Sequence, residues 1–251
     1  MNLRGSVGRL VDCAVVAWSG GPCRDPLFNR GCRMDRVAAT GAQPASGRAD
    51  RLTPGRGRRC DATVMLCDLH GFRRTAAALD PDLVMEFVGG YQTRVAAAVV
   101  AAGGHADRFF ADGMLASFGT PTGHSGRGDH ALAAMAAAIR ILSVLGQWGR
   151  ERGEKVTCGI ILSTGPVIYG LAAALPGDPR QEVVIVGPPV EDVLRLDGHA
   201  LLKQADIVCT AAVWERIGRV GGLPVDHLDI RRQADPAGGD LVAVSMTGYQ
   251  L

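Results

Sequence analysis

The chain has 251 residues and is 47% hydrophobic, which is enough to bury one sizeable core. Its longest apolar run near the middle, residues 95–102, is much shorter than the roughly 20 residues that a membrane-spanning helix needs, so no such helix is predicted. The N-terminus lacks a convincing signal-peptide pattern. Seven cysteines, an odd number without C-x-x-C spacing, indicate reduced thiols rather than disulfides or a zinc site. We therefore expect a cytoplasmic protein.

Arginines are concentrated at the N-terminus. Residues 1–60 hold eleven of them against four aspartates, a net charge of +7 in a chain whose total is +2, so the rest carries −5. The same stretch is rich in Gly, Pro, Ser and Ala and lacks periodicity, which predicts a disordered tail before a domain at 61–251. A basic tail can bind nucleic acid or anionic membranes, but this one lacks interleaved aromatic residues and an amphipathic helix, so neither partner is expected.

From residue 61 on, hydrophobic runs predict alternating strands and helices. In chain order they are a strand at 63–67, a helix at 81–102, a hairpin at 105–110 and 114–118, and a helix at 129–148. Two strands follow at 155–162 and 167–172, joined through Thr164-Gly165, and a strand at 183–186 leads into a helix that carries Arg195. Weaker strands lie at 207–209, 225–230 and 241–245. This order predicts an α+β sandwich, with helices over a mainly antiparallel sheet.

Two aspartates stand at the ends of apolar runs. Asp68 ends the first strand in VMLCDLHGF, and Asp112 lies between the strands of the hairpin in ADRFFADGMLASFG. Each has an ordinary alternative, because Asp68 could begin a simple turn and Asp112-Gly113 could be a hairpin turn. Two carboxylates at strand ends can instead share divalent cations, and the Gly71-Phe72 turn leaves backbone N–H groups for phosphate. Together they indicate nucleotide chemistry.

The order of the motifs narrows this interpretation. After the Asp68 motif come a helix, Gly103-Gly104, the Asp112 hairpin, Phe118-Gly119, a strand with Thr164-Gly165, and VVIVGPPVEDVLRL. In the last segment a glycine opens the helix that carries Arg195. From Asp61 to Met246, this succession resembles the catalytic domain of the class III adenylate/guanylate cyclases. The resemblance implies the ferredoxin-like core of that family.

The resemblance also implies a homodimer with active sites between its protomers, where ATP, or GTP, becomes a 3′,5′-cyclic monophosphate and pyrophosphate. Two Mg²⁺ or Mn²⁺ ions would be held by one protomer through Asp68, the Leu69 carbonyl and Asp112. The phosphates would lie against the backbone of His70, Gly71, Phe72 and Arg73. The partner protomer would supply Arg108 and Val184 at the base, Glu191 near the ribose, Arg195 at the transition state and Arg231 at the triphosphate.

Several positions depart from the family pattern. The lysine that reads the base is Arg108 here, the polar partner of the adenine amino group is Val184, and the asparagine one turn before the catalytic arginine is Glu191. Metal binding is predicted to be intact, whereas base reading and ribose positioning are not. Glu191 and Arg195 are four residues apart on one helix, which predicts an ion pair. The pair could be an ordinary surface pair, but the resemblance implies that it faces the triphosphate, where Glu191 would hold Arg195 away from the transition state.

Two functions remain open at this point. The first is an active cyclase that makes cyclic AMP for intracellular signalling, and Asp68 and Asp112 favour it. The second is a degenerate cyclase homology domain that binds nucleotide or a partner and regulates, and Val184 and Glu191 favour it. A metal-dependent phosphatase or a polymerase palm would share the two aspartates but would not explain residues 187–195. The Arg-rich, Lys-poor composition is compatible with a G+C-rich bacterial genome.

Overall fold

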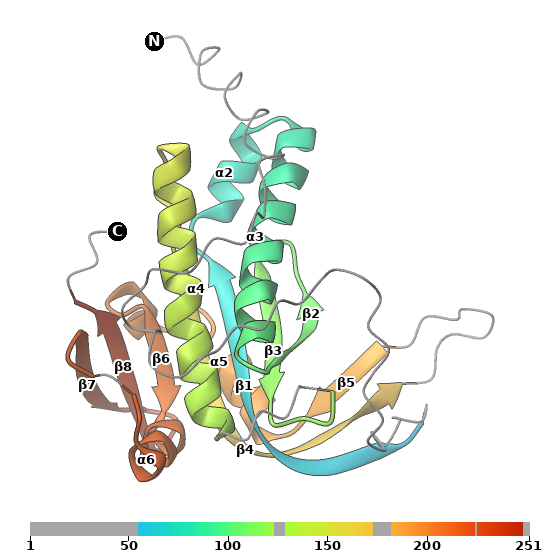
Figure 1. Ribbon diagram of the computed structural model, residues 1–251, viewed down its shortest axis with the longest axis vertical. Helices are drawn as coiled ribbons and strands as arrows, with labels where there is room; N and C mark the ends of the chain where they lie inside the picture. The colour runs from blue at the N-terminus through green and yellow to red at the C-terminus, as the bar shows by residue number, and fades with distance from the viewer. Residues whose placement is uncertain (1–54, 123–128, 173–181, 224, 248–251) are drawn as a thin grey trace. The chain divides into compact units, whose positions relative to one another are not determined.

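The computed structural model describes residues 55–122, 129–172, 182–223 and 225–247, which Figure 1 draws in colour. Most of the basic tail expected at residues 1–60 lies outside the described residues. The first strand, β1 (Gly57–Leu69), begins inside the stretch assigned to that tail and is longer than the strand expected at 63–67. Its extension is explained by pairing, because every residue from Gly57 to Leu69 has a partner in the strand β4.

All the strands form a single mixed sheet (Figure 1). Its order is β2-β3-β1-β4-β6-β8-β7, with β5 paired to β4 at one end of that long strand. Every pairing is antiparallel except that of β4 with β6, so the expected mainly antiparallel α+β fold is confirmed. The remaining strands are β2 (His105–Phe109), β3 (Gly113–Phe118), β4 (Cys158–Ala172), β5 (Glu182–Val186), β6 (Ile207–Thr210), β7 (Leu228–Ala234) and β8 (Asp240–Met246).

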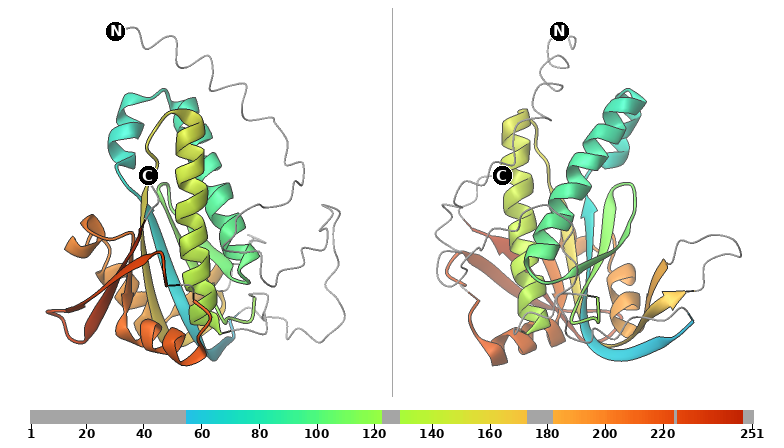
Figure 2. Two further views of the ribbon diagram at one scale, coloured as in Figure 1. Left: turned by 60° about the vertical axis from the view of Figure 1, so that its left-hand side comes forward. Right: turned by 45° about the vertical axis from the view of Figure 1, so that its right-hand side comes forward.

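Helices cover the two faces of the sheet unequally (Figure 2). One face packs against α3 (Pro81–Ala101), α4 (His130–Arg152) and α6 (Ala211–Val220), and the other against α5 (Pro188–Arg195) and the 3-10 turn η1 (Ala200–Lys203). The alternation of β1 sets this division, since Met65 and Cys67 face the larger core while Val64 and Leu66 face the smaller one. The short helix α2 (Phe72–Ala78) follows directly on β1.

The helix α4 is long and apolar enough to cross a membrane by length and composition alone. Half of its apolar stretch is buried inside the fold, where Met135, Ile141 and Leu145 pack in the larger core. The apolar composition of α4 is therefore explained by its packing against the sheet as a core helix. The helix also runs beyond the expected end at residue 148. It reaches Arg152, where Gly153 in a left-handed conformation terminates it.

Two other elements differ from expectation. The strands expected at 155–162 and 167–172 are one continuous strand, since Thr164 and Gly165 stay in register with Thr63 and Ala62 of β1. The helix α6 was not expected at all, although Val213 and Ile217 are four residues apart and both are buried. Its ten residues are fewer than the window over which helical periodicity is normally read.

Candidate active site

The pairing of β1 with β3 brings the two expected carboxylates to one place. Asp68 lies opposite Gly113 in the register, and the Leu69 N–H donates to the Asp112 carbonyl oxygen at 2.8 Å. Gly113 permits this close approach, because a Cβ at that position would lie 3.1 Å from the Cys67 carbonyl oxygen and 3.4 Å from Asp68 Oδ1. Asp68 and Asp112 are therefore neighbours at the ends of adjacent strands.

The charges at this point of the sheet are uncompensated. Burial, together with the neighbouring carboxylates of Asp112 and Asp197, raises the pKa of Asp68 to about 6. Within the described residues, no side-chain hydrogen bond or ion pair reaches Asp68 or Asp112. Partly buried carboxylates that repel one another and have no cationic side chain are suited to a divalent cation, so these residues fit the expected metal.

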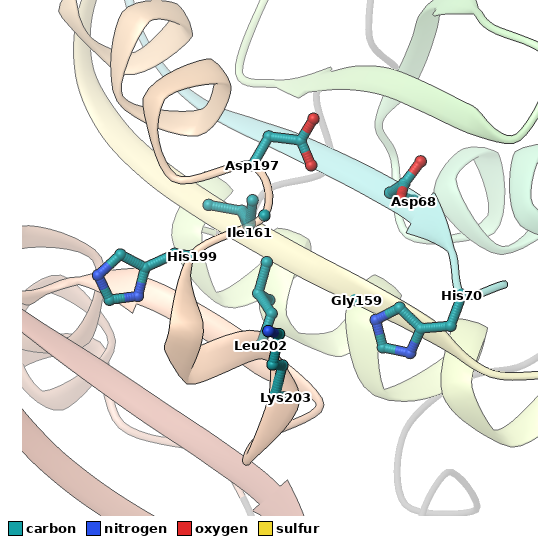
Figure 3. Close-up of a pocket in the computed structure, with 9 residues that line it drawn as sticks. Asp68, His70, Gly159, Ile161, Asp197, His199, Leu202 and Lys203 are labelled. Carbon is teal, nitrogen blue, oxygen red and sulfur yellow. The ribbon is translucent and has the colours of Figure 1, made fainter.

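A cavity of about 170 Å³ opens beside Asp68 (Figure 3). It is lined by the end of β1, the start of β4 and the segment after α5, with Asp197 and Asp68 on the same side. Within the residues that the structure describes, no group of three His, Cys, Asp or Glu side chains could hold a metal. Further oxygen ligands would have to come from phosphate, as is usual for Mg²⁺ at nucleotide sites.

The loop after Asp68 agrees with the phosphate prediction in part. Gly71 adopts a left-handed conformation (φ 76°) and opens α2, so the N–H groups of Phe72 and Arg73 lie in a first helical turn and have no intrahelical acceptor. His70 differs, because its N–H already donates to the Thr157 carbonyl oxygen at 2.9 Å. The backbone N–H of His70 is therefore engaged within the fold and is not a phosphate donor in this conformation.

Arg195 lies at the C-terminal end of α5, and the start of that helix is fixed against the sheet. Gly187 makes this contact possible, since a Cβ there would lie 2.7 Å from the Pro166 carbonyl oxygen. The expected ion pair between Glu191 and Arg195 is wrong. Arg195 Nη1 lies 2.8 Å from Asp235 Oδ2, and its Nη2 lies 3.5 Å from Asp192 Oδ1. Arg195 therefore pairs with Asp235 from a distant turn and with Asp192, three positions earlier on the helix, instead of with Glu191, four positions earlier.

The other residues assigned to the partner protomer lie on separate strands. Arg108 is exposed on β2, next to a register shift, and Val184 is exposed on β5. These two strands contact each other although they do not pair. Arg231 lies on β7, where its guanidinium donates to the Gln204 carbonyl oxygen at 3.2 Å and contacts Asp229. Their part in a composite site stays a prediction, because it depends on a second protomer.

Three acidic residues near the site were missed from the sequence. Asp197 resembles an ordinary turn residue in front of Gly198, and its approach to Asp68 depends on the path of the chain after α5. Asp192 could have been found, because it precedes Arg195 by three positions on a helix. Asp235 carried no local signal, since forty residues separate it from Arg195.

Known proteins that resemble this chain in sequence or fold include nucleotide cyclases. No family model matches the chain. A curated adenylate cyclase from Anabaena cylindrica is 24% identical over 159 residues, which are 60% of this chain but only 30% of that relative's length. The solved adenylyl cyclase CyaB from P. aeruginosa has a TM-score of 0.63 at 21% identity, covering 78% of this chain and 99% of that one.

A second solved structure with this fold is a guanylyl cyclase. The guanylyl cyclase Cya2 has a TM-score of 0.59 at 24% identity, covering 78% of this chain and 98% of its own. The chain therefore has the fold of the class III adenylyl/guanylyl cyclase catalytic domains, as its motifs predicted.

Proposed function

We propose that this chain, which has the class III cyclase fold, is a purine nucleotide cyclase that converts ATP to 3′,5′-cyclic AMP and pyrophosphate for intracellular signalling. The main support is the contact between the ends of β1 and β3, where Asp68 and Asp112 meet without a side-chain partner. An uncompensated pair of carboxylates has no stabilising role, whereas a metal–nucleotide complex would neutralise it. The similarity in sequence and fold to nucleotide cyclases supports the same reaction class.

The chain's own residues would divide the work between two protomers. Asp68, Asp112 and the Leu69 carbonyl of one protomer would hold two Mg²⁺ or Mn²⁺ ions, and the Phe72 and Arg73 N–H groups would bind phosphate oxygens. Such ions, when bound, lower the pKa of the ribose 3′-hydroxyl and neutralise phosphate charge. The ribose 3′-oxygen would form a bond to the α-phosphorus while its proton passes to solvent water. The bond between the α-phosphorus and the oxygen that bridges to the β-phosphate would break, and pyrophosphate would leave with that oxygen.

The partner protomer would face the nucleotide with its cations. Arg195 would meet the charge that grows on the α-phosphate oxygens, and Arg231 would lie toward the triphosphate. Arg108 can donate to adenine N1, but Val184 cannot accept from the adenine amino group. An unmet donor costs about 1–3 kcal/mol, so we propose that ATP is preferred over GTP by a smaller factor than such pockets normally allow.

Product analysis tests this proposal. Purified protein is incubated with ATP or with GTP, in Mg²⁺ or Mn²⁺, and cyclic and linear products are separated. Asp68→Asn and Asp112→Asn should each remove the cyclic product, whereas Asp240→Asn, which removes an exposed carboxylate of β8, should not. A wild-type protein that binds nucleotide and forms no cyclic product would contradict the cyclase proposal.

The composite site has its own test. Asp68→Ala and Arg195→Ala damage different halves of the site, so a heterodimer of the two variants keeps one intact site. Random pairing in a twofold dimer makes about half of the mixture heterodimeric, so mixing should restore about a quarter of wild-type turnover. Absence of recovery, when subunit exchange is demonstrated by a tagged pull-down, would contradict an active site shared between protomers.

Val184 and Glu191 favour a second candidate function. An apolar residue at the base and a carboxylate at the ribose both weaken nucleotide positioning, as in a degenerate cyclase domain that binds nucleotide or a partner and regulates. Such a domain would bind ATP with equal affinity in wild type and in Arg195→Ala and would give no product in either. The product analysis above separates the two functions.

A further inference from the structure

Arg195 is held by a carboxylate that comes from the far end of the sheet. Asp235 lies in the turn between β7 and β8, and its Oδ2 is 2.8 Å from Arg195 Nη1. The Asp235 side chain is 4% exposed, whereas that of Arg195 is 39% exposed. The buried carboxylate therefore contacts one edge of the guanidinium and leaves the rest accessible.

The turn fixes the position of Asp235 itself. Asp235 Oδ1 accepts a hydrogen bond from the Ala237 N–H at 3.0 Å, and the Asp235 N–H donates to the Gly239 carbonyl oxygen at 3.0 Å. The Ala237 N–H is the largest influence on the pKa of Asp235, and together with Arg195 it holds that pKa below its ordinary value despite burial. An ionised carboxylate in a closed turn has little freedom to reorient.

A second anchor reaches Arg195 from its own helix. Asp192 Oδ1 lies 3.5 Å from Arg195 Nη2, and Asp192 Oδ2 accepts a hydrogen bond of 2.8 Å from Ser163 Oγ. Ser163 is 1% exposed on β4, so it ties this carboxylate to the centre of the sheet. Two carboxylates, each attached to a different part of the fold, therefore form ion pairs with the two terminal nitrogens of one guanidinium, although Asp235 Oδ2 accepts no hydrogen bond among the described residues.

We propose that Asp235 is a positioning residue, which orients the Arg195 guanidinium for the charge that develops on the α-phosphate. The inference rests on the proposed cyclase function. A planar guanidinium that faces a fixed carboxylate at each terminal nitrogen has a preferred orientation, and a donor oriented in advance loses little entropy when the transition state forms. Glu191, which the sequence favoured as the partner of Arg195, makes neither of these contacts.

The experiment is a double-mutant cycle in turnover, with ATP and Mn²⁺, over wild type, Asp235→Asn, Arg195→Ala and the double variant. Asp235→Asn keeps an acceptor for the Ala237 N–H and removes the charge that faces Arg195. We expect kcat to fall between about tenfold and a hundredfold, with KM changed by less than about twofold. In the Arg195→Ala background the same substitution should cause no further loss, because Asp235 acts through Arg195.

Two further variants complete the design. Asp240→Asn removes an exposed carboxylate from the same hairpin and should leave kcat unchanged. Asp235→Ser can also accept from the Ala237 N–H, so it replaces Asp235→Asn if thermal unfolding shows that the latter does not fold.

The outcomes separate this inference from the proposed function. An active wild type with an unchanged or higher kcat in Asp235→Asn would overturn the positioning role alone, and a higher kcat would mean that Asp235 withholds Arg195. An equal loss in the presence and absence of Arg195 would also overturn it. A wild type without cyclic product would overturn the cyclase proposal and this inference together.

Discussion

Two parts of β1 place polar side chains in opposite situations. In its middle, Thr63 Oγ1 is hydrogen-bonded to His130 Nδ1 at 2.8 Å, and Asp61 Oδ2 is 2.6 Å from Arg216 Nη1. Arg216 also contacts Asp129, the N-cap of α4, at 2.6 Å. We call Asp61, Thr63, Asp129, His130 and Arg216 the paired cluster. The second part is the C-terminal end of the strand, where Asp68 meets Asp112 and Asp197 with no side-chain partner among the described residues.

The difference separates stabilising groups from groups placed for a ligand. Each charge of the paired cluster is compensated inside the chain, and the cluster joins β1, α4 and α6. The carboxylates around Asp68 instead oppose folding, because their repulsion and partial burial are not offset by any neighbour. Substitutions in the paired cluster and at Asp68 should therefore change stability in opposite directions, and only those at Asp68 should change turnover.

The largest effect is expected at Asp68. Asp68→Asn should reduce cyclase turnover by at least a hundredfold, since it removes a metal ligand. The raised pKa means that the Asp68 carboxylate favours folding only while protonated, and this contribution is lost as the pH rises through about 6. At pH 7.5 the variant should therefore be more stable than wild type, by on the order of 1–2 kcal/mol after allowance for solvent screening. Denaturant unfolding measures this difference.

Mn²⁺ provides a check on the same variant that does not depend on activity. The ion should raise the melting temperature of the wild type and have little effect on Asp68→Asn, because binding to the folded state stabilises it by mass action. Equal stabilisation of both proteins would show that Mn²⁺ binds elsewhere, and a less stable Asp68→Asn would contradict the uncompensated charge.

Arg216 should give the converse result. Arg216→Ala removes the cation that two carboxylates share and should lower the free energy of unfolding by about 1–3 kcal/mol, while kcat stays within a factor of about two. The matched control is Arg219→Ala, an exposed arginine on the same helix, which should change stability little. A large loss of turnover at full folding would show that the paired cluster also serves the active site.

The smallest effect is a pH dependence from His130. Burial lowers the pKa of His130 and the nearby Arg216 lowers it further, against the opposite influence of Asp129 and Asp61. The unfolded chain, with an ordinary pKa of 6.5, binds the proton first, so the free energy of unfolding should fall as the pH drops below 6.5. His130→Asn should flatten this slope, whereas His227→Asn, at an exposed histidine, should not.

The His130 measurement needs the Asp68→Asn background. Asp68 titrates in an overlapping range with the opposite sign, because its folded-state pKa is raised rather than lowered. In the wild-type background, the pH dependence of the unfolding free energy due to His130 would be partly cancelled by that due to Asp68. Equal slopes with and without His130 would show that this histidine does not set the acid sensitivity.

Much of the fold could be predicted from local patterns in the sequence. The helix at 81–102 was signalled by Pro81 at its first turn and by Gly103-Gly104 after it, and α3 ends within one residue of that range. The hairpin around Asp112 was signalled by apolar runs on both sides. The length of β4 could not be predicted, because Thr164-Gly165 resembles a turn unless its pairing with β1 is known.

The site was predictable to the extent that its residues lie close together in sequence. Asp68 and Asp112 were found because each ends an apolar run, and the register of β1 with β3 brings them together. The partner of Arg195 was assigned to Glu191 because helical spacing was the only guide. Asp235 and Asp197 reach the site through the path of the whole sheet and the loop after α5, and no local pattern encodes such an approach.

The pairing of β1 with β4 also bears on how the protein is made. Thr63 and Thr164 are neighbours in the sheet although they are 101 positions apart, and every residue of β1 has a partner in that distant strand, whereas only Thr63 to Asp68 also pair with the nearer β3. Such long-range pairing slows folding, because a large loop must close before its contacts form. On the ribosome, one edge of β1 would remain unpaired until β4 is synthesised, although the second half of the strand can pair earlier with β3. The strand that carries Asp68 is therefore completed only after β4 has been made, and its free edge is open to other chains until then.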